Sequence, residues 1–243
     1  MQSIVLIKPG QFELVEAAPP EAPGKDEAQV RIHRVGICGT DLHAYAGKQP
    51  FFSYPRVLGH EIGCEIVALG ETQLQHDLKV GARCCIRPYL NCGECGACKR
   101  GYENACMKNQ VLGVHRDGGM RELINVPIDK LHKANLTDEE LALVEMLSIG
   151  AHAARRAQIT PGEFALVIGA GPIGLGVSQF AHQAGARVLM MDISDKRLTF
   201  AKQQPGIEFA IDAKGDVLEQ LNAINPVELP TLVFDATGSA QSM

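Results

Sequence analysis

The segment FALVIGAGPIG, residues 164–174, decides the fold of the second half of the chain. Its first five residues are apolar and predict a buried β-strand, and the glycine turn predicts the start of a helix that reaches about Ala184. Downstream, apolar runs alternate with helical patterns: strands are expected at 188–191, 209–211 and 231–234, and helices at 195–203 and 217–224. Strands that alternate with helices predict an α/β fold with a doubly wound parallel sheet.

The turn has the pattern Gly-x-Gly-x-x-Gly, placed between a strand and a helix. Its residues are Gly169, Gly171, Pro172, Ile173 and Gly174, with Ala170 between the first two glycines. Glycines allow a tight turn and the close approach of a pyrophosphate, and the helix N-terminus supplies N–H donors with a favourable dipole. In this context the motif predicts a dinucleotide-binding site.

Asp192 ends the next expected strand, at the position where a carboxylate accepts hydrogen bonds from an adenosine ribose. A carboxylate there also repels a 2′-phosphate, so the sequence favours NAD over NADP. The nearby Lys196 and Arg197 leave a tolerance of NADP open. The alternative role of Asp192 is a cap on the following helix.

The first 130 residues are patterned mostly as β-structure. Short apolar runs separated by Pro and Gly predict strands at 4–7, 12–15, 29–35, 62–69 and 80–86, and another that ends at Val126. Thr137 then precedes three acidic residues, which predicts a capped helix that continues to Gln158 and carries Glu145 in an apolar neighbourhood. We expect a β-rich domain over residues 1–154 and the α/β domain over 155–243.

The β-rich part carries a possible metal site between Cys38 and Glu61. A thiolate at Cys38, an imidazole at His60 and a carboxylate at Glu61 are ligand types that Zn²⁺ accepts. A set of two or three protein ligands leaves a coordination position open to a substrate. The alternative for Cys38 alone is a buried, unreactive thiol.

Four further cysteines lie within fifteen residues: Cys92, Cys95, Cys98 and Cys106. Without an export signal, this close spacing predicts a four-thiolate structural zinc site in a lobe over residues 89–107, rather than a disulfide framework. Cys64, Cys84 and Cys85 lie in strand-like runs and are interpreted as core thiols.

The composition narrows the classes of function. The 243 residues are 46% hydrophobic, with a net charge of −5 and a pI near 5.9, so no basic surface for nucleic acid is expected. Residues 164–186 lack charged side chains, but their glycines, Pro172 and His182 exclude a membrane span. The N-terminus has no secretory pattern. We expect a globular, cytoplasmic protein.

These motifs, in this order, resemble the zinc-containing medium-chain alcohol and polyol dehydrogenases. The resemblance rests on 38–43, on 59–61, on the four-cysteine lobe, on Asp117-Gly118-Gly119 and on the glycine turn. It implies a GroES-like zinc domain followed by a Rossmann domain. Glu145 matches the position of a Glu in the sorbitol, threonine and sugar-acid dehydrogenases, and residues 49–56 most resemble the galactonate-type sugar-acid branch. Met146, where relatives usually have Pro, departs from the pattern.

The resemblance also implies a role for each site residue. Cys38, His60 and Glu145 would hold a catalytic zinc, with Glu61 as an exchangeable or alternative ligand; which of the two Glu residues is the third ligand stays open. Asp41 would orient His60. With the structural zinc, each chain would bind two zinc ions.

A proton relay is implied as well. The proton of the substrate hydroxyl would leave through Thr40 and the cofactor ribose to His43, while hydride passes to the nicotinamide. The alternatives are a helix cap for Thr40 and a surface imidazole for His43.

The predicted function is zinc- and NAD-dependent oxidation of a secondary hydroxyl in a polyol or sugar acid. The alternatives are a dehydrogenase for a simple alcohol or amino-acid alcohol, a zinc-free quinone reductase of the same superfamily, and a non-catalytic zinc-stapled NAD-binding module. The run at 231–234 resembles an interior strand of a longer sheet. We therefore expect a Rossmann domain that is incomplete at its C-terminus and a full-length homodimer or homotetramer.

Overall fold

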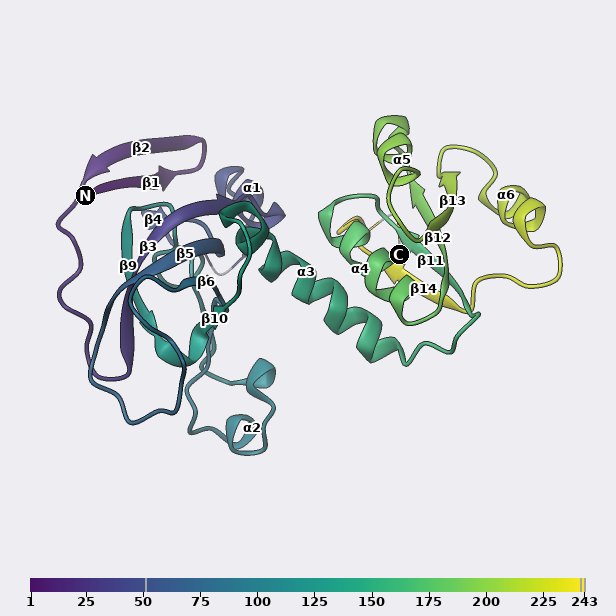
Figure 1. Ribbon diagram of the computed structural model, residues 1–243. Coiled ribbons are helices and arrows are strands. Elements are labelled where there is room, and N and C mark those ends of the chain that lie inside the picture. Colours follow the sequence, from purple (N-terminus) through teal and green to yellow (C-terminus); the bar gives the residue numbers. More distant parts are fainter. Residues whose placement is uncertain (51, 241, 243) are drawn as a thin grey trace. The chain divides into compact units, whose positions relative to one another are not determined.

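The computed structural model describes residues 1–50, 52–240 and 242 (Figure 1). The chain divides into two compact units, Met1–Glu145 and Met146–Met243. This division falls inside one long helix, and the boundary expected between residues 154 and 155 lies further along the same helix. Phe51, in the segment that resembles the sugar-acid branch, and the last residue, Met243, lie outside the described residues.

The first unit consists of antiparallel sheets with short helices. Its strands are β1 (Gln2–Lys8), β2 (Gln11–Glu16), β3 (Glu27–Gly36), β4 (Arg56–Val57), β5 (Glu61–Leu69), β6 (Arg83–Ile86), β7 (Tyr89–Leu90), β8 (Gln110–Val111), β9 (Leu123–Pro127) and β10 (Leu131–Lys133). The helices are α1 (Gly39–Tyr45) and α2 (Gly96–Lys99), with one-turn 3-10 helices η1 (Glu103–Ala105) and η2 (Ile128–Lys130). The sheets have the orders β2-β1-β4, β10-β6-β5-β3-β9 and β7-β8.

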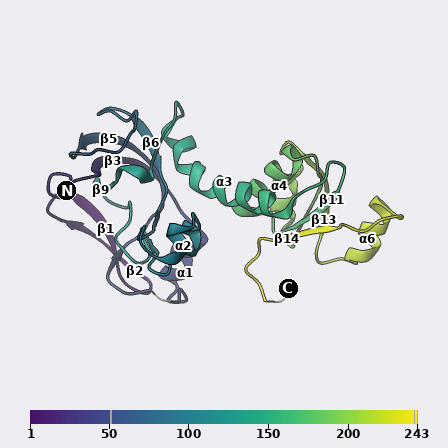
Figure 2. The same ribbon diagram turned by 90° about the horizontal axis from the view of Figure 1, so that it is seen from below.

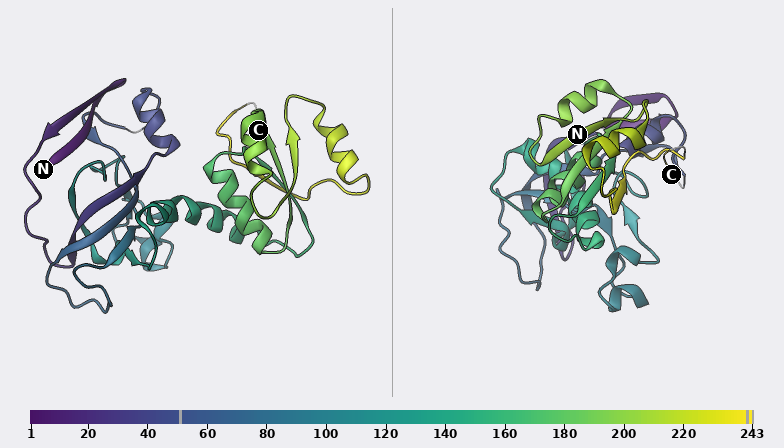
Figure 3. Two further views of the ribbon diagram at one scale, coloured as in Figure 1. Left: turned by 45° about the horizontal axis from the view of Figure 1, so that its top comes forward. Right: turned by 90° about the vertical axis from the view of Figure 1, so that its right-hand side faces the viewer.

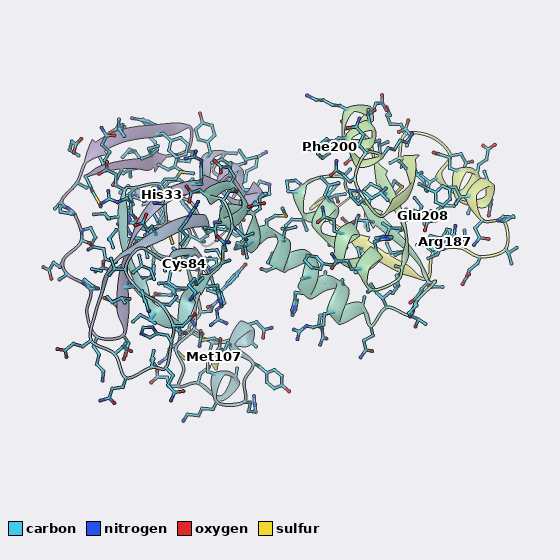
Figure 4. The ribbon with its side chains drawn as sticks, viewed as in Figure 1. His33, Cys84, Met107, Arg187, Phe200 and Glu208 are labelled. Carbon is cyan, nitrogen blue, oxygen red and sulfur yellow. The ribbon has the colours of Figure 1, made fainter. Side chains whose placement is uncertain are left out.

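The core of this unit lies on one face of the five-stranded sheet. Ala28 and Val30 of β3 are fully buried and alternate with more exposed neighbours, as a half-buried strand requires. They pack with the buried Cys64 of β5 and Cys84 of β6, which are partners in register. Figure 4 labels Cys84 among the side chains of this unit. The interpretation of Cys64, Cys84 and Cys85 as core thiols is confirmed, since their exposed fractions are 0%, 0% and 4%.

One predicted strand is shorter than expected. Residues 80–86 were expected to form a strand, but β6 begins only at Arg83. Val80 is 63% exposed, and Gly81 has a φ of +84°, in the left-handed region that strands do not contain. The chain therefore turns at Gly81 before it enters the sheet.

The long helix α3 (Asp138–Ala157) begins with the predicted cap. Thr137 Oγ1 accepts a hydrogen bond from Glu140 N at 3.2 Å, and Glu140 Oε2 accepts one from Thr137 N at 2.8 Å. These reciprocal bonds satisfy two N–H groups at the helix start. A Cβ on Gly63 of β5 would lie 2.5 Å from Asp138 O, so glycine is needed for the helix to start against this strand.

The second unit is a four-stranded parallel sheet with the order β13-β12-β11-β14. Its elements are β11 (Phe164–Ile168), α4 (Pro172–Gln183), β12 (Arg187–Asp192), α5 (Asp195–Ala201), β13 (Ile207–Asp212), α6 (Val217–Ile224) and β14 (Leu232–Asp235). Figure 2 shows β14 next to β11 at the edge of the sheet. The predicted order of strands and helices is confirmed.

Both faces of this sheet are covered. Ala165 and Val167 of β11 pack with buried residues of α4 and α5, whereas Phe164 and Leu166 pack on the opposite side with Leu221 of α6. Figure 3 shows helices on both sides of this sheet. The sheet is therefore doubly wound, as the strand and helix pattern predicted.

A charged side chain at the start of β12 contacts both neighbouring strands. Arg187 of β12 lies over the Phe164 ring, 4.4 Å from its centroid, and donates to Glu208 of β13 at 3.1 Å (Figure 4).

Among the described residues, no helix combines the length and the apolar character that a membrane span needs.

Candidate functional site

Three predicted ligands lie together in the first unit. The candidate ligand atoms of Cys38, His60 and Glu61 are all within 4.8 Å of one another, and we call these three residues the first cluster. Cys38 caps the N-terminus of α1, while His60 and Glu61 stand at the start of β5. The exposed fractions of His60 and Glu61 are only 6% and 7%. The local fold thus places a thiol, an imidazole and a carboxylate in one shielded position.

The charges of the first cluster are unbalanced without a cation. Burial by itself would lower the pKa of His60, but a hydrogen bond with Cys38 and the charges of Asp41 and Glu145 raise this pKa to about 9. Burial raises the pKa of Glu61, although the nearby His60 opposes that change. His60 Nδ1 is buried and has no hydrogen-bond partner within the described parts of the chain. The donor set and the unpaired nitrogen fit a divalent cation such as zinc.

Glu145 lies beside the first cluster and outside the group within 4.8 Å. It is on α3, its exposed fraction is 8%, and its charge acts on both His60 and Glu61. Burial raises the pKa of Glu145. Tyr89 Oη donates a hydrogen bond to Glu145 Oε1 at 3.1 Å. Glu61 therefore belongs to the first cluster with Cys38 and His60, whereas Glu145 is held beside it by a phenol.

Asp41 is 4% exposed and belongs to the first turn of α1. Its Oδ2 accepts a hydrogen bond from Cys38 N at 2.9 Å, which fixes the backbone of the cysteine. Its Oδ1 is buried without a hydrogen-bond partner in the described residues, so the link to His60 here is one of charge. Asp41 was expected to orient His60, and the hydrogen bond that it makes goes to Cys38.

Thr40 and His43 are three residues apart on α1 and so lie on the same side of the helix. Cys38 Sγ is 3.8 Å from Thr40 Oγ1, which places this hydroxyl beside the first cluster. Thr40 is half-buried and His43 is exposed. Thr40 therefore lies beside the first cluster, and His43 lies at the surface.

The four-cysteine lobe forms a second group of candidate ligands. The Sγ atoms of Cys92, Cys95, Cys98 and Cys106 lie within 4.8 Å of one another. Cys106 Sγ accepts from Cys92 N at 3.3 Å and from Lys108 N at 3.4 Å. Backbone N–H groups of Cys98 and Met107 lower the pKa of Cys95 to about 6, which favours its thiolate. None of the eight cysteines is in a disulfide, and these four fit a tetrahedral zinc site.

A buried lysine lies behind the lobe. Lys130 is 3% exposed, donates to Asn91 Oδ1 at 2.5 Å and pairs with Asp129 at 2.7 Å. Asn91 Nδ2 in turn lies 3.9 Å from Cys98 Sγ. Asn91 thus connects a buried positive charge to the cysteine group.

The glycine turn of the second unit has the geometry that the motif requires. Gly169 has a φ of +101°, and a Cβ on Gly174 would lie 1.8 Å from Gly169 O. Gly171 caps α4, with Pro172 and Ile173 in the first turn, and a Cβ on Gly171 would meet no atom within 4 Å. Two glycines are therefore needed by the fold, and the third leaves open space at the helix N-terminus, where a phosphate binds well.

Asp192 ends β12 next to this turn and is 6% exposed. Its Oδ2 accepts a hydrogen bond from Ala170 N at 2.7 Å, and its Oδ1 accepts one from Ser194 N at 2.8 Å. Arg197 Nη1 lies 3.7 Å from Oδ2 and its side chain is 60% exposed. Asp192 holds the glycine turn as well as standing where a ribose is expected, whereas the cap of α5 is Ser194.

Comparison with known proteins agrees with this architecture. A family described as alcohol dehydrogenase GroES-like domain matches residues 24–136, and one described as zinc-binding dehydrogenase matches residues 172–243. A zinc-type alcohol dehydrogenase-like protein of Haemophilus influenzae is 37% identical over 98% of this chain and 70% of its own.

The chain belongs to the zinc-containing medium-chain dehydrogenases.

Within this dehydrogenase family, the L-galactonate-5-dehydrogenase of Escherichia coli K12 is 46% identical over 91% of this chain and 65% of its own. The NADH complex of an alcohol dehydrogenase from E. coli CFT073 superposes with a TM-score of 0.88 at 35% identity, covering 98% of this chain and 70% of that one. The chain spans 65% and 70% of the length of the two relatives compared. Zinc and a nicotinamide cofactor are the cofactors of this family.

Two contacts of this family member were not anticipated from its sequence. No motif marks Tyr89 as the donor to Glu145; its place three residues before Cys92 is the one signal that sets it near the lobe. The bond from Ala170 N to Asp192 follows from the pairing of β11 with β12, which puts the glycine turn beside the end of β12.

Proposed function

We propose that the protein is an oxidoreductase that removes hydride from a secondary hydroxyl of a polyol or sugar acid and delivers it to NAD, with zinc as the second cofactor. The observation that carries the proposal is the first cluster, in which Cys38, His60 and Glu61 meet within 4.8 Å. The identity of 46% with a galactonate dehydrogenase supports a sugar acid as the substrate class.

The roles of the cluster residues follow from their chemistry. Cys38, His60 and one of the two carboxylates, Glu61 or Glu145, would hold zinc, which lowers the pKa of a bound hydroxyl and so favours its oxidation. The charge of Glu145 acts on His60, and Glu61 lies within 4.8 Å of His60 and is affected by its charge, so exchange between the two carboxylates is chemically open. Asp41 keeps the Cys38 backbone in place through its hydrogen bond.

The proton and the cofactor are served by different residues. Thr40, beside Cys38, would accept the hydroxyl proton as it gives up its own, which would pass by way of the cofactor ribose to the exposed His43 and then to solvent. Gly171 and the N-terminus of α4 would accept the pyrophosphate, and Asp192 would select NAD over NADP by its negative charge. Arg197, which is exposed beside Asp192, would face the ribose.

The proposal includes a second, structural zinc ion in the four-cysteine lobe. It also includes the division into a zinc domain of residues 1–154, with its lobe at 89–107, and a nucleotide domain of residues 155–243. A cytoplasmic location and assembly of the protein into a homodimer or homotetramer complete it.

The test combines metal content with a substrate screen. We expect two zinc ions per chain, NADH formation with aldonates or polyols, and loss of turnover in His60→Ala with an unchanged far-ultraviolet spectrum. His152→Ala, at an exposed histidine of α3, is the matched control and should keep its activity. Turnover of simple alcohols alone would refute the substrate class. Two bound zinc ions and NADH binding without turnover of any alcohol would favour a non-catalytic module.

A further inference from the structure

The four-cysteine lobe is the loop that connects the two strands of a short antiparallel ribbon, β7 and β8. Tyr89 and Leu90 of β7 pair with Val111 and Gln110 of β8, and Leu112 N adds a hydrogen bond to Pro88 O at 3.1 Å. All four cysteines lie in the loop between these two strands. Cys92 and Cys106 stand at the two ends of the loop, and their Sγ atoms are 3.5 Å apart. A metal ion in the lobe would therefore close the loop where it leaves the ribbon.

The same ribbon contacts Glu145, which lies beside the first cluster, through the side chain of Tyr89. Tyr89, the first residue of β7, donates to Glu145 Oε1 at 3.1 Å. A phenol is protonated at neutral pH, and a carboxylate has no proton to give, so Tyr89 is the donor in this bond. A buried carboxylate that accepts a phenol hydrogen bond has its charge stabilised and its orientation restricted.

We propose that Tyr89 is a positioning residue through which the four-cysteine lobe orders Glu145 beside the first cluster. The inference rests on the proposed function, because it assigns metal sites to both groups. On this inference, the metal ion of the four-cysteine lobe has a second role besides stability. It would hold the ribbon whose Tyr89 donates to Glu145. The carboxylate of Glu145 is then held near His60, beside the cluster that Cys38, His60 and Glu61 form.

The base of the ribbon is fixed from the opposite side. Asn91 follows β7 directly, accepts a hydrogen bond from the buried Lys130 at 2.5 Å and approaches Cys98 Sγ at 3.9 Å. Lys130 belongs to η2, and its carbonyl oxygen accepts from Arg87 N at 2.8 Å, two residues before Tyr89. The backbone of Tyr89 therefore lies between two anchored positions, which fixes the place from which its side chain, 37% exposed, reaches Glu145.

The test measures Co²⁺ binding to the first cluster. The visible bands of bound Co²⁺ that are lost in His60→Ala report this cluster, and a competing chelator gives the affinity. Tyr89→Phe removes one hydroxyl and should keep two metal ions per chain at saturation. It should weaken Co²⁺ at the first cluster about tenfold to a hundredfold, the usual effect of losing a partner of a ligand, and change the band positions. Tyr102→Phe, at a tyrosine of the same lobe that is 61% exposed, should change neither.

The coupling to the lobe is tested in a double-mutant cycle. Cys98→Ser removes a lobe ligand, and Asn91→Ala is a milder variant that keeps all four cysteines. Each should weaken Co²⁺ at the first cluster about tenfold when Tyr89 is present and should add little to Tyr89→Phe, because the route is then already broken. Asn91→Ala keeps the test valid if Cys98→Ser does not fold.

The outcomes separate the two proposals. Unmodified protein that binds no Co²⁺ at the first cluster would overturn the proposed function and this inference together. A first cluster that binds Co²⁺ with the same affinity and spectrum in Tyr89→Phe as in Tyr102→Phe would overturn the inference alone. Lobe variants that weaken the first cluster equally with and without Tyr89 would also overturn it.

Discussion

The carboxylate of Asp192 has two tasks in one place. It accepts backbone N–H groups from Ala170 and Ser194, and it stands beside the turn where a nucleotide is expected. A substitution at this residue therefore disturbs the glycine turn as well as any contact with the ribose. The substitution should lower kcat/KM with NAD more than kcat/KM with NADP, because the carboxylate attracts the ribose hydroxyls of NAD and repels the 2′-phosphate of NADP.

For Asp192→Ala we expect kcat/KM with NAD to fall on the order of tenfold to a hundredfold, with a smaller change for NADP, so that the preference for NAD narrows. Initial rates with both cofactors on one substrate measure the ratio. Arg197→Ala, at the exposed neighbour of Asp192, is the comparison variant. An unchanged ratio of the two kcat/KM values would refute the ribose assignment.

Lys130 is the buried cation of the first unit that serves no step of the proposed reaction. Lys130→Met keeps the length of the side chain and leaves Asn91 Oδ1 without its ammonium donor. Losing a hydrogen bond to a charged group costs about 2 kcal/mol, so the free energy of unfolding should fall by about that amount. Urea unfolding of the zinc-loaded protein measures it. Lys133→Met, at a lysine whose side chain is 43% exposed, should change stability far less.

At the scale of elements, the start of α3 depends on the bonds between Thr137 and Glu140. Thr137→Ala removes the cap, which costs about 1 kcal/mol in comparable helices. The Thr137 bonds lower the pKa of Glu140. Since the folded pKa lies below the unfolded one, this contribution to stability is present above the unfolded pKa and is lost as the pH falls through the folded pKa.

Urea midpoints of the unmodified protein and Glu140→Gln, measured from neutral pH down through the pKa range of carboxylic acids, check the sign. The difference between the two proteins should be largest near neutral pH and should shrink in acid. A difference that grows as the pH falls would contradict the assignment.

Two glycines of the turn between β11 and α4 should respond differently to substitution, one through stability and the other through nucleotide binding. A Cβ on Gly174 would overlap Gly169 O at 1.8 Å, so Gly174→Ala should lower the thermal stability of the second unit. Gly171 has open space, so Gly171→Ala should change the free energy of unfolding by about 0.5 kcal/mol or less. It should nevertheless weaken NADH binding more than about tenfold, because its methyl group occupies the space where the backbone approaches a phosphate. Thermal unfolding and NADH titration of both variants check this contrast.

The elements with a strong periodic pattern were predictable from the sequence. The expected strand at 164–168 and helix at 138–158 match β11 and α3 closely, because their apolar spacing and capping residues act locally. The four cysteines were equally readable, since ligands close in sequence are close in space.

Contacts between distant segments were not predictable in the same way. Strands β4, β7 and β8 have two residues each and no periodicity to detect. Tyr89 and Glu145 are brought together by the packing of the ribbon and α3, which no local pattern encodes. The resemblance named Glu145 as a ligand and Glu61 as an exchangeable or alternative one, and the group within 4.8 Å contains Glu61 together with Cys38 and His60.

At the scale of the molecule, removing metal should affect one unit. Both groups of candidate ligands belong to Met1–Glu145, and no member of either group lies in Met146–Met243 among the described residues. After chelation we expect faster amide hydrogen exchange at residues 89–111 and around the first cluster. The amides of β11 and β12 should keep their protection. Equal loss of protection in β11 and β12 would contradict this expectation.

The division into two units also has an optical consequence. The chain has no tryptophan, and its four tyrosines, Tyr45, Tyr54, Tyr89 and Tyr102, all belong to the first unit. Tyrosine emission therefore follows the first unit alone, and the second unit contributes to near-ultraviolet spectra through phenylalanine only. Fluorescence from NADH at the glycine turn would be observed without a tryptophan background. One sample thus gives two separate fluorescence signals, tyrosine emission from the metal-binding unit and NADH emission from the bound nucleotide.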